Sequence, residues 1–91
     1  MYDQVRNLEF VNNTCLNMQD LSPTPEAAGL WADGSPSQHV LDFIVTGNRF
    51  INEADNSGYK YGIVLNSHID NVVIGPDNVF YDIKGQNVRH Q

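Results

Sequence analysis

The sequence predicts an all-β solenoid of about three stacked coils. One phrase, an alternating apolar run followed by a tight turn ending in asparagine and then another apolar residue, occurs three times, at residues 8–15, 43–50 and 72–80. The turn asparagines Asn13, Asn48 and Asn78 are 35 and 30 residues apart. A second, glycine-led phrase recurs at residues 29–35 and 62–68. Self-similarity at such a period is typical of solenoids.

Each coil is therefore expected to contain a strand, an asparagine turn, a variable loop, a glycine-led strand and a second loop. Alternation along the first strands places three rows inside the coil: Leu8, Phe43 and Val72; Phe10, Val45 and Ile74; Cys15, Phe50 and Phe80. The glycine-led strands add two further inward rows, Leu30 with Ile63 and Ala32 with Leu65. Helices are not expected, since no window has sustained three- and four-residue apolar spacing.

Stacking predicts specific contacts between coils. Equivalent residues of neighbouring coils lie about 4.8 Å apart, so Phe50 should be buried between Cys15 and Phe80. The turn asparagines should form a ladder in which each side-chain amide bonds to the next. Asparagine suits such a turn because it tolerates a left-handed backbone.

These residues carry a resemblance to a known family. The turn at residues 47–50, its partners Asn13 and Asn78, and the strand at residues 62–65 resemble the pectate-lyase-like superfamily over roughly residues 5–85. Within it, the chain looks most like phage tailspikes and related polysaccharide-processing proteins. The resemblance implies a right-handed parallel β-helix of about three rungs and a virion or extracellular location. The matched residues are architectural, so they imply a fold and no particular reaction.

Length and composition limit the remaining possibilities. Residues 1–91 are expected to form a single β-helix segment, either part of a longer solenoid or completed by oligomerisation, because neither end resembles a cap. A net charge of −6 argues against nucleic acid and anionic membranes as partners. No apolar run has the length of a membrane span, and no secretory signal opens the sequence. The single cysteine, Cys15, excludes an internal disulfide and is expected to be a small buried hydrophobe.

The outward rows predict contacts with other chains. They are Glu9, Ile44 and Val73; Val11, Thr46 and Gly75; and Trp31 with Val64. They are mostly apolar, which weighs against a catalytic face and favours burial by another copy. A trimer packed side by side about an axis is the favoured assembly, and end-to-end stacking is the alternative. Scattered surface apolar residues are also normal in a solvent-exposed face.

Catalytic and metal chemistry find little support in the sequence. Asp33 aligns with Asn66 and Asp42 with Asn71, so no stacked acid pair suited to glycoside hydrolysis emerges. The polar group flanking the second loop is interpreted as turn residues: Asp33, His39, Asp42, His68 and Asp70. His39 and His68 occupy similar positions and could stack or share a metal, but they lack a third ligand at zinc spacing. Residues 55–58 are interpreted as a plain turn rather than a calcium loop. No cofactor and no metal are predicted.

One cluster has the side chains that sugars require. Aromatic faces beside polar loops stack on sugar rings while polar neighbours bond the hydroxyl groups. The candidate glycan-contact residues are Trp31, Asp33, Tyr59, Tyr61 and His68. Packing at a seam between chains explains the same residues equally well.

Three functions therefore stay open. The favoured one is a β-helix segment of a tailspike-like or carbohydrate-processing protein, with a structural or glycan-contacting role. The second is a polysaccharide lyase, hydrolase or epimerase whose catalytic residues lie partly outside this chain. The third is a purely structural, self-assembling module. The apolar outward rows favour the first and third, so an enzymatic role for this segment is the less favoured one.

Overall fold

A computed structural model describes residues 3–19, 26–54 and 57–90, and throughout these ranges the regular structure is β-strand. The strands are β1 (Asp3–Arg6), β2 (Glu9–Val11), β3 (Thr14–Leu16), β4 (Ala27–Ala32), β5 (Gln38–Leu41), β6 (Ile44–Thr46), β7 (Arg49–Ile51), β8 (Tyr59–Leu65), β9 (Ile69–Asp70), β10 (Val73–Ile74), β11 (Val79–Tyr81) and β12 (Gln86–His90). In these ranges no helix is long and apolar enough to cross a membrane.

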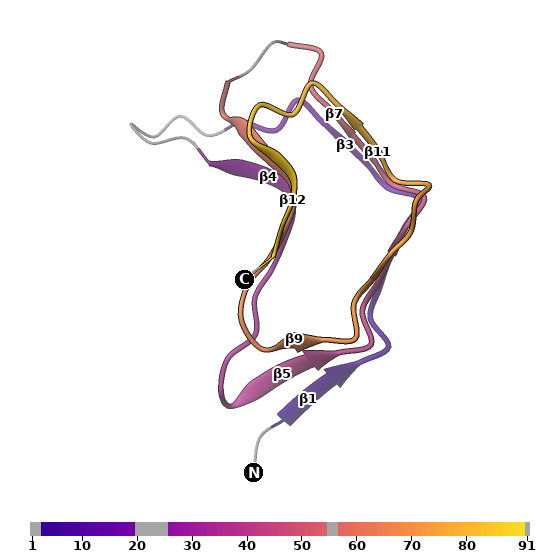
Figure 1. Cartoon of the computed structure of the whole chain (residues 1–91), viewed down its shortest axis with the longest axis vertical. Coiled ribbons are helices and arrows are strands. Elements are labelled where there is room, and N and C mark those ends of the chain that lie inside the picture. Colours follow the sequence, from indigo (N-terminus) through magenta and orange to yellow (C-terminus); the bar gives the residue numbers. More distant parts are fainter. Residues whose placement is uncertain (1–2, 20–25, 55–56, 91) are drawn as a thin grey trace.

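The strands form four parallel sheets of three strands each. Sheet A contains β1, β5 and β9; sheet B contains β2, β6 and β10; sheet C contains β3, β7 and β11; and sheet D contains β4, β8 and β12. The chain passes through the four sheets in the same order three times, so β1–β4 form a first coil, β5–β8 a middle coil and β9–β12 a third coil. Seen down the shortest axis, the three coils superpose around a common interior (Figure 1). The fold is all-β with stacked parallel strands, as predicted.

The predicted register between coils is confirmed. Cys15 pairs with Phe50, and Phe50 pairs with Phe80. Phe50 is fully buried, and its ring stacks on that of Phe80 with 5.0 Å between the ring centres. Cys15 is only half-buried, because β3 is an edge strand of sheet C and has a described strand on one side only. Burial still raises the pKa of its thiol.

The asparagine ladder is present as predicted. Nδ2 of Asn13 donates to Oδ1 of Asn48 at 3.2 Å, and Nδ2 of Asn48 donates to Oδ1 of Asn78 at 3.0 Å. The backbone amides of Asn13 and Asn48 donate to the same two acceptors, at 2.9 and 3.0 Å. Asn48 is fully buried, so these bonds satisfy polar groups that water cannot reach.

The left-handed backbone lies one residue earlier than predicted. At the corner between sheets B and C, Asn12 has φ 56° and Gly47 has φ 67°, whereas the ladder asparagines that follow them do not have positive φ. The preceding residue turns the chain, which leaves the ladder asparagine free to point its amide along the stack. The earlier corner, between sheets A and B, uses Asn7, Asp42 and Asn71, with φ of 54–59°.

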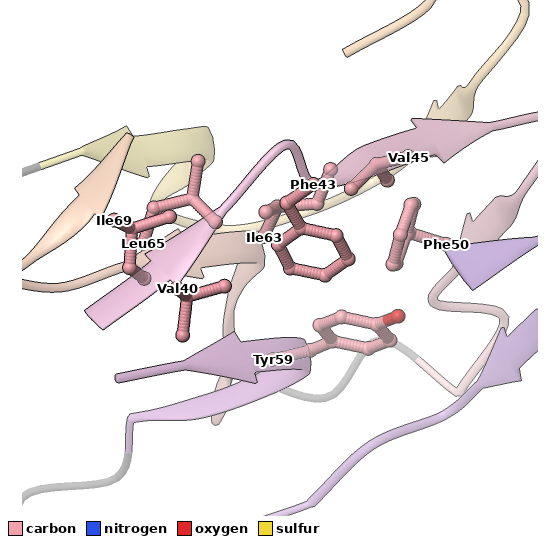
Figure 2. Packing of buried hydrophobic residues seen from close by; sticks show 8 residues of the cluster. All are labelled: Val40, Phe43, Val45, Phe50, Tyr59, Ile63, Leu65 and Ile69. Carbon is pink, nitrogen blue, oxygen red and sulfur yellow. The ribbon is translucent and has the colours of Figure 1, made fainter. Parts of the chain in front are cut away.

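The core lies in the middle coil. Buried apolar side chains from that coil fill the interior together with Ile69 of β9 (Figure 2): Val40, Phe43, Val45, Phe50, Tyr59, Ile63 and Leu65. Among the described strands, only those of this coil have a neighbouring strand on both sides. The contrast within one predicted inward row shows the effect, because Phe43 is 2% exposed whereas Leu8, its first-coil equivalent, is 41% exposed.

Glycine in the second phrase has a steric cause. A Cβ atom at Gly62 would overlap the ring of Phe80, and one at Gly29 would overlap the ring of Phe50. The rings of Phe50 and Phe80 in sheet C therefore reach across the interior to the middle of β4 and β8 in sheet D. Glycine is required at both positions because each ring occupies the space of a side chain.

Candidate functional site

The outer face of sheet D carries the predicted row of Trp31 and Val64, which the third coil extends with Arg89. Val64 is in register with Trp31 of β4 and with Arg89 of β12. Trp31 is 47% exposed, but Val64 is fully buried and lies outside the interior cluster. The prediction that Val64 stands on an outward row that a single chain leaves uncovered is therefore wrong, since Val64 is already buried between the strands of Trp31 and Arg89.

Tyr61 lies half-buried on the same sheet beneath an arginine. The guanidinium carbon of Arg89 is 5.3 Å from the centre of the Tyr61 ring, and Nη1 donates to the phenolic oxygen at 3.4 Å. This is cation–π geometry. Arg89 thus occupies one face of the ring that the sequence analysis assigned to sugar stacking.

Tyr59 belongs to the core and not to the surface. It is fully buried, and its hydroxyl donates to the carbonyl oxygen of Cys15 at 2.8 Å. Burial, with a smaller contribution from the nearby Cys15 thiolate, raises its pKa. Its assignment as a glycan contact is corrected for this reason.

A bulge explains why Tyr59 and Tyr61 differ. Ala27 pairs with Tyr59 but Ala28 pairs with Tyr61, so Lys60 is an extra residue on β8. One extra residue reverses the alternation of a strand. The two tyrosines therefore have different surroundings although simple alternation gives them the same direction.

The two remaining candidate glycan-contact residues, Asp33 and His68, follow the ends of β4 and β8. Asp33 is exposed and, with Trp31, lines a cavity of about 260 Å³. Other lining residues, Val5, Leu8, Leu30, Val40 and Phe43, include the inward rows of the first coil, so this cavity is the open first-coil end of the interior. His68 packs against His39 with 5.0 Å between ring centres and an angle of 40° between the planes. The structure therefore brings Trp31 and Asp33 together and does not gather all five predicted residues.

The histidine pair is the arrangement closest to a metal site. His68 has φ 62°, and its Nδ1 is buried without a hydrogen-bond partner, as is Oδ1 of Asn66. Among the described residues, no group of three or more histidine, cysteine or acidic side chains could hold an ion. Two imidazoles alone fall short of the three protein ligands of a catalytic zinc site. Of the calcium-loop alternative at residues 55–58, positions 55 and 56 lie outside the described residues.

A hollow lies at the corner between sheets A and B, and we call it the corner groove. It has a volume of about 690 Å³, and its walls carry both polar and apolar side chains: Asn7, Glu9, Asp42, Ile44, Asn71, Val72 and Val73. Glu9, Ile44 and Val73 are the predicted outward row, and their register is confirmed. Val73 is 57% exposed.

A second polar ladder forms one wall of the corner groove. Nδ2 of Asn71 donates to Oδ1 of Asp42 at 3.1 Å, and Nη1 of Arg6 lies 3.7 Å from Oδ2 of Asp42. The wall offers amide donors and carboxylate acceptors, and the adjoining row offers an apolar strip. This combination can bond hydroxyl groups while an apolar surface packs beside them.

Sequence reasoning aligned Asp42 with Asn71 but did not connect them to a groove. The available signal was their position, since Asn7, Asp42 and Asn71 each directly precede the first inward residue of a coil. The groove itself depends on the angle at which sheet A meets sheet B, and alternation along a strand does not specify that angle.

No protein-family model, curated protein or solved structure matches the chain.

Proposed function

We propose that this chain is a structural segment of a right-handed parallel β-helix, similar to those of the pectate-lyase-like superfamily. Its role is to maintain a stack of coils that associates with further copies. The observation that supports this role most is the Asn13–Asn48–Asn78 ladder, which links all three coils through side-chain amides. Asn48 and the core beneath it are fully buried, so they serve stacking and do not face a substrate.

The distribution of burial supports the same role. The fully buried side chains belong to the middle coil, which gains its core only because the two other coils cover it. Solenoids behave in this way, since each repeat contacts only its neighbours and stability is a sum of interface terms. The buried residues of this segment therefore serve the stacking of coils more than the binding of a ligand.

A glycan-contacting role is the second candidate, and the corner groove is the observation that favours it. The groove pairs a polar wall at Asp42 and Asn71 with an apolar strip at Ile44 and Val73. A neutral saccharide lying along the stack would meet both. The aromatic residues predicted to contact glycan support this role less, because Tyr59 is buried and Arg89 covers one face of the Tyr61 ring.

Hydrogen-exchange mass spectrometry, with and without a panel of neutral and acidic polysaccharides, separates the two candidates. The structural role predicts that β5–β8 exchange most slowly and that no saccharide changes the pattern. Added protection confined to residues 7–9, 42–44 and 71–73 would instead establish the glycan role. Rapid exchange throughout β5–β8 would contradict the structural role.

A further inference from the structure

The two end faces of the stack are different from each other, so the stack has a direction. Each face presents four edge strands, β1–β4 on the first-coil face and β9–β12 on the third-coil face. Unpaired strand edges are templates for pairing with another chain.

The asparagine ladder leaves an acceptor on one face. Oδ1 of Asn48 accepts from the backbone amide and Nδ2 of Asn13, and Oδ1 of Asn78 accepts from the same two groups of Asn48. Oδ1 of Asn13 is the equivalent acceptor of the first coil, and no described residue donates to it. The first-coil face therefore carries an unused acceptor.

The other face carries the matching donor. The backbone amide of Asn78 is equivalent to those of Asn13 and Asn48, but its only partner among the described residues is the Gly75 carbonyl oxygen, at 3.5 Å. A bond of that length is weak. A donor at the third-coil face and an acceptor at the first-coil face complete one another only when the faces of two copies meet head to tail.

The apolar rows fit the same orientation. Leu8 is 41% exposed on the first-coil face, at the open cavity of about 260 Å³, while Val72 is the third-coil member of the same row. Head-to-tail contact places Leu8 of one copy over Val72 of another, and the small Cys15 over the ring of Phe80. Pro76 belongs to neither β10 nor β11, so it removes no donor from the strand edges.

We propose that the first-coil face binds the third-coil face of a second copy, so that the asparagine ladder and the four sheets continue from copy to copy. This inference rests on the proposed structural function and specifies its partner and orientation. A two-fold contact between identical faces would oppose acceptor to acceptor or donor to donor. A head-to-tail contact without ring closure propagates into a filament.

Sedimentation velocity over a wide concentration range tests the proposal with the 91-residue chain. The expected result is a mass that rises with concentration through dimers to longer species. Leu8→Lys on the first-coil face and Val88→Lys on the third-coil face should each abolish this rise, because each would bury an unpaired charge in the contact. An equimolar mixture of the two variants should form a heterodimer and stop there.

Other arrangements give different results and would overturn the proposal. A two-fold contact leaves one variant dimeric by itself and the mixture without heterodimer. Side-by-side packing leaves both variants assembled and is disrupted instead by Ile44→Lys, and a wild-type monomer at all concentrations excludes every assembly. Far-ultraviolet dichroism checks that each protein remains β-structured, and a β-structured monomer would refute this inference while leaving the proposed structural function standing.

A milder variant covers the case in which the lysine variants do not fold. Asn13→Ala removes the ladder acceptor at an exposed position of the first-coil face. It should weaken self-association several-fold with the spectrum unchanged. Unaltered association of a folded Asn13→Ala protein would contradict the role given to the ladder.

Discussion

Nδ2 of Asn48 donates to Oδ1 of Asn78 at 3.0 Å and to the carbonyl oxygen of Phe10 at 2.7 Å, so a single buried amide joins the third coil to the first. Its own Oδ1 accepts two bonds from Asn13. The middle asparagine is thus bonded on both sides, whereas Asn13 occupies an exposed end of the ladder.

Asn48→Ala should therefore lower the free energy of unfolding far more than Asn13→Ala. Loss of the central amide leaves several part-buried bonding groups of Phe10, Asn13 and Asn78 without a bond, which together should cost more than about 3 kcal/mol. The same change at Asn13 should cost about 1 kcal/mol. Urea unfolding followed by dichroism measures both values. Equal costs at the two positions would show that the ladder does not carry the stacking.

Phe50→Ala should destabilise the fold by about 3–5 kcal/mol, as do large truncations in other cores. Phe50 is fully buried and stacks on Phe80, which is only half-buried. Phe80→Ala is the matched control and should cost less, because part of its ring is already exposed. A folded Phe50→Ala protein with an unchanged urea midpoint would show that the aromatic column is misassigned.

Gly62→Ala should destabilise the chain although alanine is ordinarily tolerated in strands. The added methyl group would overlap the Phe80 ring and approach the carbonyl oxygen of Asn87. Overpacking of this kind costs about 1–3 kcal/mol. Adding Phe80→Leu should recover part of the loss, which a double-mutant cycle of unfolding free energies measures. Strict additivity of the two changes would argue against the close approach of ring and glycine.

Alkaline pH should unfold the protein partly through Tyr59. Its pKa is raised in the folded state, first by burial and then by the Cys15 thiolate. The folded state therefore holds the phenolic proton more tightly, and the associated stability is present below the unfolded pKa of about 10 and is lost as pH rises above it. Tyr59→Phe should flatten this loss, and Tyr81→Phe, which changes an exposed ring, is the control. Identical alkaline slopes for wild type and Tyr59→Phe would contradict this explanation.

The repeats predicted the interior well because stacking couples sequence period directly to space. The Asn13–Asn48–Asn78 spacing gave the ladder, and strand alternation gave the column of Cys15, Phe50 and Phe80. These features depend only on equivalent residues lying one strand apart.

The outer surface was predicted less well because it depends on local exceptions. The extra residue Lys60 sends Tyr59 inward, and alternation alone cannot locate a bulge. Val64 is buried between strands β4 and β12, where its register partners are Trp31 and Arg89. Arg89 belongs to the third coil, which lacks the glycine-led phrase, so the repeats did not reveal this strand. The corner groove arises from the angle between two sheets, which the strand pattern leaves undetermined.

The central claim, that three coils stack in parallel and in register, is tested most directly by nuclear Overhauser effects in a labelled sample. The structure predicts contacts from Val45 to both Phe10 and Ile74, and between the rings of Phe50 and Phe80, within one network of parallel strands. Slowly exchanging side-chain amide protons of Asn48 should accompany them. Antiparallel contacts among β2, β6 and β10, or the absence of any contact between Phe50 and Phe80 in the folded protein, would contradict the stacked fold.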